Sequence, residues 1–154
     1  MLNTKTKREW IVLLCRFFFL TYVFVMIYFL FFSERYGRTS HYDTMQYNLV
    51  PFQEIQRYLV NAQSFSLELF VVNILGNVCM FIPFGALLFV WRGKPVGFWY
   101  VTVRSLLLSL LIESIQLVTK VGVFDVDDII LNTAGGIVGF LIYQLARKIV
   151  RRIR

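Results

Sequence analysis

Residues 113–139 read ESIQLVTKVGVFDVDDIILNTAGGIVG and hold the polar residues around which the rest of the chain is arranged. One long apolar segment ends there, a short loop follows, and a second apolar segment begins beneath three aspartates. An ionisable side chain at the edge of a hydrocarbon-spanning segment costs roughly a few kcal/mol unless it is paired or hydrated. A chain that keeps several such residues together is therefore expected to use some of them. The gathered residues are Glu113, Gln116, Asp125, Asp127, Asp128 and Asn132.

The composition is that of an integral membrane protein. Hydrophobic residues make up 58% of the 154 residues, and the mean hydropathy is +0.65, far above the values of soluble domains. We therefore expect residues 1–154 to form a single membrane domain. The net charge of +7 comes from basic residues beside apolar runs, as positive-inside topology requires, so nucleic-acid binding is not predicted.

Four apolar segments are long enough to cross a bilayer as helices. They are predicted at about 10–32, 67–90, 96–118 and 127–149. The loop at 33–66 between the first two is polar and irregular, and Pro51 within it could open a short amphipathic helix lying at the membrane surface. The predicted fold is thus an all-α bundle of four transmembrane helices, with a short amphipathic helix in its first loop.

The basic residues predict how the bundle is oriented. Ten lie on the side of the two termini, namely Lys5, Lys7, Arg8, Arg92, Lys94, Arg147, Lys148, Arg151, Arg152 and Arg154. Four lie on the other side, namely Arg35, Arg38, Arg57 and Lys120. The positive-inside rule then places both termini in the cytoplasm and turns the first loop and the Asp-rich turn outwards.

With that orientation, three helices carry their unusual polar residues in the outer half of the membrane. The second helix contributes two asparagines, the third a glutamate and a glutamine, and the fourth two aspartates and an asparagine. A shared, outward-facing polar pocket explains this common depth better than chance does. Together with the loop asparagine that precedes Pro51, its predicted ligand-binding residues are Asn48, Asn73, Asn77, Glu113, Gln116, Asp125, Asp128 and Asn132.

Small residues predict close helix packing. Gly135, Gly136 and Gly139 share one stripe of the fourth helix with Asp128 and Asn132, and small residues at such spacings let helices approach closely in lipid. On the second helix, Pro83 removes a backbone hydrogen bond, and Gly85 after it permits a close contact.

The acidic residues have several interpretations. Asp125 stands where an aspartate caps a helix start, whereas Asp127 is expected to point away into solvent. The two asparagines of the second helix are expected to form interhelical hydrogen bonds. Alternatively, Glu113, Asp125 and Asp128 could hold a divalent cation or perform acid–base chemistry, which makes them the candidate metal ligands and catalytic residues.

Four blocks of this sequence resemble the VanZ-like family. They are Asn48-Leu49-Val50-Pro51-Phe52, then Asn73-Ile74-Leu75-Gly76-Asn77 running into Phe81-Ile82-Pro83-Phe84-Gly85, then Glu113-Ser114-Ile115-Gln116, and finally Phe124-Asp125-Val126-Asp127-Asp128 with Asn132-Thr133-Ala134-Gly135-Gly136. The blocks occur in the family's order and cover about residues 48–143. Each is weak alone, but four together are specific.

The resemblance implies an accessory membrane protein linked to low-level teicoplanin resistance in Gram-positive bacteria. It implies no catalytic role, because the family has no agreed one. It carries over the family's motif positions, which are Asn48, Pro51, Phe52, Asn77, Pro83, Phe84, Gly85, Glu113, Gln116, Asp125, Asp128, Asn132 and Gly136.

The predicted function is therefore that of a multi-pass plasma-membrane protein of a bacterium, whose outer pocket engages a lipid or the acyl tail of a lipoglycopeptide. Membrane lipids, the antibiotic and a lipid-linked cell-wall precursor are the partners considered. Two alternatives stay open, which are a lipid-directed enzyme or transporter with a carboxylate or metal site, and a structural partner subunit. The sequence does not decide whether the protein is an enzyme, and no cofactor is predicted beyond a divalent cation that the carboxylates could hold.

Overall fold

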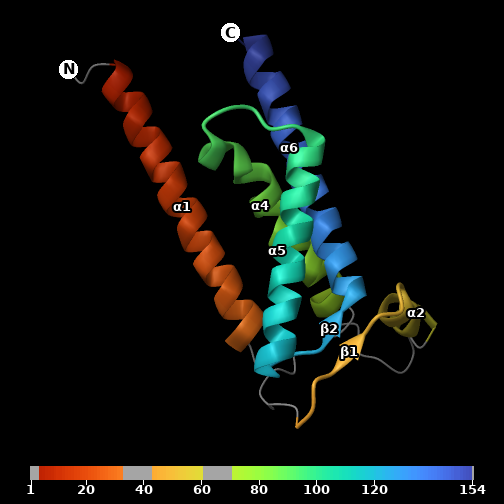
Figure 1. Ribbon diagram of the computed structural model, residues 1–154. Coiled ribbons are helices and arrows are strands. Elements are labelled where there is room, and N and C mark those ends of the chain that lie inside the picture. The colour runs from red at the N-terminus through yellow and green to blue at the C-terminus, as the bar shows by residue number, and fades with distance from the viewer. Residues whose placement is uncertain (1–3, 33–42, 61–70, 154) are drawn as a thin grey trace.

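The computed structural model describes residues 4–32, 43–60 and 71–153 (Figure 1). Residues 67–70, the predicted start of the second span, lie outside the described residues, as do parts of the loop at 33–66. The elements in chain order are α1 (Thr4–Phe32), β1 (Tyr47–Asn48), α2 (Gln53–Val60), the π-helix η2 (Val71–Leu75), α4 (Gly76–Arg92), α5 (Phe98–Thr119), β2 (Phe124–Asp125) and α6 (Val126–Ile153).

The described residues contain four helices long and apolar enough to cross a membrane, which confirms the prediction of four membrane helices. These stretches are Glu9–Phe31, Asn73–Arg92, Phe98–Thr119 and Val126–Arg152. Figure 1 shows the N- and C-terminal ends of the chain at one end of the bundle, and β1, β2 and α2 at the other. Residues 43–60 and the turn between α5 and α6 therefore lie at the same end.

Helices α4 and α5 each end at a residue whose backbone is in the left-handed region. Gly93 follows α4 with φ 69°, and its N–H donates to the carbonyl of Phe89. Lys120 follows α5 with φ 58°, and its N–H donates to the carbonyl of Gln116. Such residues satisfy the last carbonyl groups of a helix and turn the chain sharply, so α4 and α5 follow each other as antiparallel neighbours.

The centre of the bundle is the contact between α4 and α6, and glycines make it close. A Cβ atom added at Gly85 would overlap the carbonyl oxygen of Gly136, and one added at Gly139 would overlap the carbonyl oxygen of Ile82. On the other side of α6, a Cβ at Gly136 would overlap the Oγ of Ser105 in α5. The predicted packing role of these glycines matches this geometry, because their backbones touch the neighbouring helices directly.

Helix α1 packs on α4 through aromatic and sulfur-containing side chains. Phe19 lies against Phe84 with ring centroids 6.1 Å apart, and the hydroxyl of Tyr22 donates to the carbonyl of Met80. Met26 is fully buried, whereas many other apolar side chains of α1, such as Phe17 and Phe24, are exposed. An exposed apolar surface of this size on a helix long enough to span a bilayer fits contact with lipid.

Two features depart from the predicted all-α bundle. Strands β1 and β2 pair in parallel, with Tyr47 opposite Phe124 and Asn48 opposite Asp125, because the loop between the first two spans folds back over the turn between α5 and α6. The second span also begins with a π-helix that contains Asn73. The spacing of a regular α-helix therefore does not describe how Asn73 and Asn77 are placed.

The glycine contact predicts that Gly139→Ala destabilises the folded protein. Alanine would favour the helix by about 1 kcal/mol, but its Cβ would overlap backbone atoms of Ile82 and Ala86, and overpacking costs about 1–3 kcal/mol. The thermal unfolding midpoint of the purified protein in detergent measures the net effect. The control is Gly97→Ala, because a Cβ added at Gly97 has nothing within 4 Å. Equal midpoints for the two variants would contradict the steric interpretation.

Candidate functional site

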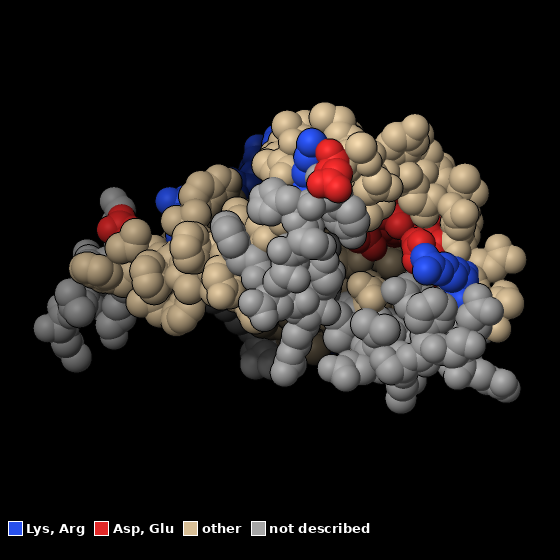
Figure 2. Space-filling view, turned by 90° about the horizontal axis from the view of Figure 1, so that it is seen from below, with Lys and Arg blue, Asp and Glu red and all other residues tan. Residues whose placement is uncertain are grey.

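The predicted polar residues gather mainly at the end of the bundle that holds β1, β2 and α2. Figure 2 looks onto this end and shows acidic atoms in a recess of the surface, next to a basic side chain. Glu113, Asp125 and Asp127 are buried there, with exposed fractions of 2%, 8% and 1%. The buried carboxylates must be stabilised by hydrogen-bond donors, because burial otherwise disfavours their charged form.

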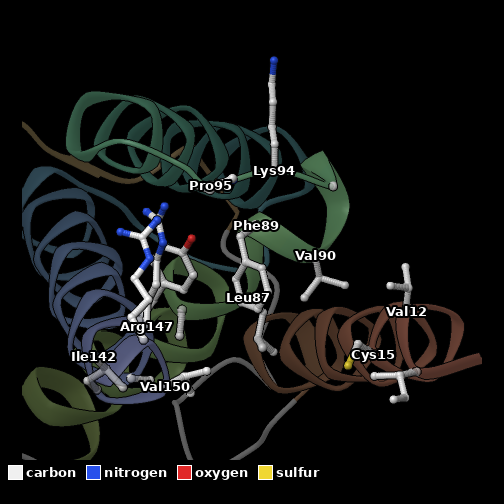
Figure 3. A pocket seen from close by; sticks show the side chains of 16 residues that line it. Val12, Cys15, Leu87, Phe89, Val90, Lys94, Pro95, Ile142, Arg147 and Val150 are labelled. Carbon is white, nitrogen blue, oxygen red and sulfur yellow. The ribbon is translucent and has the colours of Figure 1, made fainter. Parts of the chain in front are cut away.

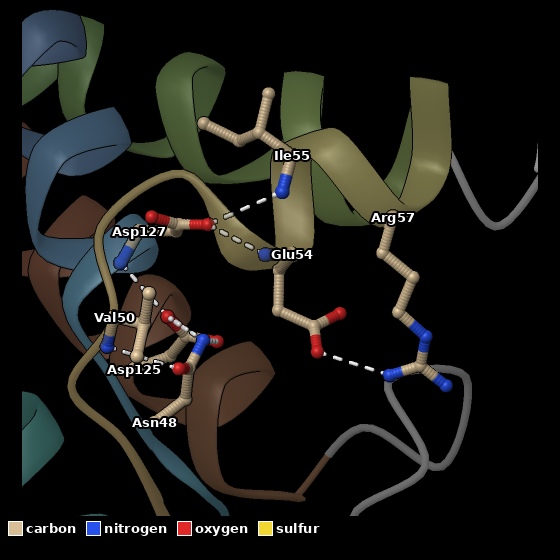
Figure 4. Close-up of polar contacts among 7 residues, drawn as sticks. All are labelled: Asn48, Val50, Glu54, Ile55, Arg57, Asp125 and Asp127. Atoms are coloured by element: carbon tan, nitrogen blue, oxygen red, sulfur yellow. Dashed lines mark hydrogen bonds and ion pairs between the residues drawn. The ribbon is translucent and has the colours of Figure 1, made fainter. Parts of the chain in front are cut away.

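Asp127 binds the first turn of α2 and is not exposed to solvent, so the prediction for this residue is wrong. Its Oδ2 accepts the backbone N–H groups of Glu54 at 2.8 Å and Ile55 at 3.2 Å, and its Oδ1 accepts that of Phe52 (Figure 4). The first N–H groups of a helix lack partners within the helix and lie at the positive end of its dipole. A carboxylate at that position is therefore both hydrogen-bonded and electrostatically favoured.

The sequence before α2 explains why this acceptor comes from another helix. Phe52 precedes the helix and has no side-chain oxygen with which to cap it. Its φ of 64° lies in the left-handed region, which costs about 1–2 kcal/mol for a residue with a Cβ. The N–H of Gln53 donates to the carbonyl of Val50 at 3.4 Å and closes the turn. Asp127 then accepts the neighbouring N–H groups and offsets the strain.

Asp125 caps the start of α6 and joins three segments. Its Oδ1 accepts the N–H of Asp127 at 2.8 Å, as expected for a helix cap. Both of its oxygens lie 3.3 Å from the Nδ2 of Asn48 in β1, and its own N–H donates to the Oε2 of Glu113 at 3.1 Å. A chain of carboxylates and backbone N–H groups therefore runs from α5 through β2 and α6 to α2.

Burial raises the pKa of the Asp125 carboxyl above its ordinary value of 3.8. Desolvation is the largest cause, and it outweighs the hydrogen bonds from Asp127 and Asn48, which favour the charged form. The nearby carboxylates of Asp127 and Glu54 act in the same direction as burial. Burial therefore stabilises the protonated form of Asp125 relative to an exposed aspartate.

The other predicted site residues lie in separate contacts. Asn77 in α4 donates through its Nδ2 to Oδ1 of Asp128, which forms one of the predicted interhelical bonds. Buried Gln116 donates to the carbonyl of Leu30 in α1 at 3.0 Å. The remaining two are Asn132, which donates to Ser109 Oγ at 2.9 Å, and half-buried Asn73 in η2. These contacts thus join Asn48 and Glu113 to Asp125, Asn77 to Asp128, Gln116 to α1, and Asn132 to Ser109.

The contacts of the carboxylates bear on the predicted cation site. Among residues 4–32, 43–60 and 71–153, no three His, Cys, Asp or Glu side chains form a group that could hold a metal ion. The described contacts of the Asp125 and Asp127 oxygens are with N–H donors. Donor hydrogens pointing at an oxygen occupy directions that a cation would need.

Sequence reasoning missed the role of Asp127, although one signal for it exists. The Pro51-Phe52-Gln53 start of α2 offers no Ser, Thr, Asp or Asn at the capping position. A helix start without such a residue needs an acceptor from elsewhere, from water or from a ligand. The partner itself lies about 75 residues away, with a sequence separation of 73 for the bond to Glu54, and no local pattern identifies it.

Comparison with known proteins matches most of the chain to one family and to one curated relative. Residues 19–147 match the VanZ/LLP1 family. The chain is 36% identical over 104 residues to Protein VanZ of Enterococcus faecium, an alignment that covers 68% of this chain and 64% of that relative. No solved structure matches the chain.

We predict that Asp127→Asn loosens α2. Asparagine keeps one acceptor oxygen but directs an NH₂ group at backbone N–H donors, and a hydrogen bond to a charged group contributes about 1.5–3 kcal/mol. A loss of about 2 kcal/mol corresponds to roughly thirtyfold faster amide exchange through local opening. Hydrogen exchange of peptides covering 47–60, followed by mass spectrometry, measures this rate.

The matched control for this variant is Glu54→Gln. It removes a charge from the same helix, where Glu54 pairs with Arg57 at 3.0 Å on the surface, and exposed pairs contribute little. Its exchange should stay close to that of the wild type. Unchanged exchange in Asp127→Asn would show that the carboxylate does not hold α2.

The raised pKa of Asp125 predicts a pH dependence of stability. The folded chain binds more protons than the unfolded chain between pH 3.8 and the higher folded pKa, so the free energy of unfolding falls as the pH rises through that window. Asp125→Asn should remove this part of the dependence. Thermal unfolding midpoints of both proteins across acidic to neutral pH provide the comparison. Parallel profiles would contradict the predicted shift.

Proposed function

The chain belongs to the VanZ/LLP1 family, and we propose that it is a bacterial envelope protein that gives low-level protection against teicoplanin-type lipoglycopeptides. The family relation supports a role related to that of Protein VanZ. The chain spans 64% of the length of that relative. The proposed activity therefore rests on the structure of the site as well as on membership of the family. The proposed site is the end of the bundle that holds Asp125, Asp127 and α2.

The observation that carries the proposal is an apolar surface segment, residues 49–52, whose backbone is held by the buried carboxylate of Asp127 and by Asn48. Leu49, Val50 and Phe52 are exposed by 59%, 58% and 57%, although the turn that carries them is held by hydrogen bonds to Asp127 and Asn48. Ordered and exposed apolar side chains at the end of a membrane bundle are suited to contact with lipid or an acyl tail. Order in the free state reduces the entropy lost on binding.

The distribution of charge supports an outward position for this segment. The ten basic residues on the side of the termini, against four on the other side, favour a cytoplasmic location of both termini. The apolar segment 49–52 and α2 then lie at the outer membrane surface. A lipoglycopeptide that inserts its tail into the outer leaflet, or a lipid-linked cell-wall precursor, would meet the protein at this end.

A second function is favoured by one observation. The raised pKa of Asp125 is the property expected of a general acid, so a lipid-directed enzyme is the alternative. In that case Asp125 would carry the proton and Glu113 would position it, since Glu113 Oε2 accepts the N–H of Asp125.

The test is the teicoplanin susceptibility of a sensitive Gram-positive host that expresses the protein, with vancomycin measured alongside. Wild type should raise the inhibitory concentration of teicoplanin selectively. Asp127→Asn, which releases the segment, and Leu49→Gln, which makes it more polar, should both abolish the effect at matched membrane levels. Asp43→Asn, an exposed carboxylate at the same end, should keep it.

Each outcome has a clear meaning. No protection by wild type would overturn the proposal. Protection that survives both Asp127→Asn and Leu49→Gln would separate the function from this segment. Loss of protection in Asp125→Asn together with normal activity of Leu49→Gln would favour the enzymatic alternative, because only the carboxyl group would then be needed.

A further inference from the structure

The opposite end of the bundle carries an apolar groove that the proposed function does not use. It lies between α1, α4 and α6, near the chain termini, with a volume of about 770 Å³ (Figure 3). Its walls are formed mainly by aliphatic side chains, such as Val12 of α1, Leu87 of α4 and Ile142 of α6. A groove of this kind beside exposed apolar helices is filled by hydrocarbon when the protein is in a bilayer, since interiors keep few voids.

Basic side chains stand at the rim of this groove. Arg147 and Arg151 come from successive turns of α6, whereas the side chain of Lys94, from the turn after α4, extends away from the other lining side chains (Figure 3). Residues four apart lie on the same face of a helix, so both guanidinium groups belong to the groove side. The described lining contains no Asp or Glu, and no ion pair within the described part of the chain involves any of these three cations.

We propose that the groove binds one anionic phospholipid from the leaflet at the end that holds the termini. The aliphatic walls fit an acyl chain, and the guanidinium groups of Arg147 and Arg151 fit the phosphate of the headgroup. Arginine is suited to this role because its planar guanidinium presents paired donors to phosphate oxygens. Basic clefts between transmembrane helices bind anionic headgroups by the same combination. A neutral phospholipid fills the walls equally well but carries no net charge for the rim.

The inference is independent of the proposed resistance function. It rests on the groove and its rim, whereas that function rests on the buried carboxylates at the other end of the bundle. The lipid would also tie α1 to the rest of the bundle at this end, because Val12 and Cys15 of α1 line the same groove as α4 and α6.

Native mass spectrometry of the purified full chain tests the proposal with dioleoyl phosphatidylglycerol and dioleoyl phosphatidylcholine as probes. Wild type should retain one phosphatidylglycerol in preference to phosphatidylcholine. Each basic residue near a membrane contributes roughly a fivefold effect, so the double variant Arg147→Gln/Arg151→Gln should bind phosphatidylglycerol about thirtyfold more weakly. Glycerol phosphate, which carries the headgroup chemistry without chains, should not displace the lipid.

The matched control is Lys148→Gln/Arg152→Gln. It removes the same charge from the same helix, but neither residue lines the groove, so binding should stay close to the wild-type value. Ala146→Trp keeps the charges and narrows the groove, and it should also weaken binding. This second variant keeps the test valid if the double arginine variant does not fold.

Three results would overturn the proposal. Equal loss in Lys148→Gln/Arg152→Gln would show that the lipid responds only to the overall positive charge of this end. Equal retention of phosphatidylcholine would show passive filling by any lipid. Displacement by glycerol phosphate alone would show a phosphate site to which the apolar walls contribute nothing.

Discussion

The buried carboxylate of Asp127 holds residues 52–55, at the start of α2, to the membrane bundle. Asp127 lies in the first turn of α6 and accepts N–H groups from the first turn of α2, so its charge lies at the N-termini of two helices. The dipoles of both helices favour a negative charge there. Because Phe52 cannot cap α2, the short helix depends on α6 for its acceptor. The left-handed backbone of Phe52 is tolerated for the same reason, since the hydrogen bonds to Asp127 offset its cost.

Asp127 can reach α2 only if α6 has a fixed position against α4 and α5, and the glycines of α6 fix that position through close backbone contacts. Gly135, Gly136 and Gly139 bring the backbone of α6 onto α4 and the side chains of α5. With α6 so placed, Asp128 meets Asn77 and Asn132 meets Ser109. Polar side chains inside a bilayer have no water to bond with, so they must reach a partner on a neighbouring helix. The close approach of the helices brings these partners within hydrogen-bond distance. Packing inside the membrane therefore positions the acidic end.

Local sequence patterns predict the membrane helices, one helix cap and the close packing of the fourth helix. The four membrane helices follow from apolar length, and the cap at Asp125 from an aspartate directly before a helix. The glycine stripe predicted a close helix contact from spacing alone, and the structure shows that α4 is the partner. The prediction of solvent exposure for Asp127 is wrong because it follows from helical spacing alone, which turns this residue to the side of α6 away from Asp128 but says nothing of distant segments. The segment 47–60 covers that side, and its pairing with β2 joins residues 77 positions apart, as for Asn48 and Asp125.

The sequence by itself therefore determined the class of protein, the number of its membrane helices and the end of the bundle at which its carboxylates gather, because hydropathy and helical spacing are properties of neighbouring residues. Only the tertiary structure decided what those carboxylates do. Their partners are largely backbone N–H groups, which every residue except proline possesses. The sequence therefore does not show which residues supply these donors. The basic rim of the groove between α1, α4 and α6 likewise exists only once three distant segments are packed together.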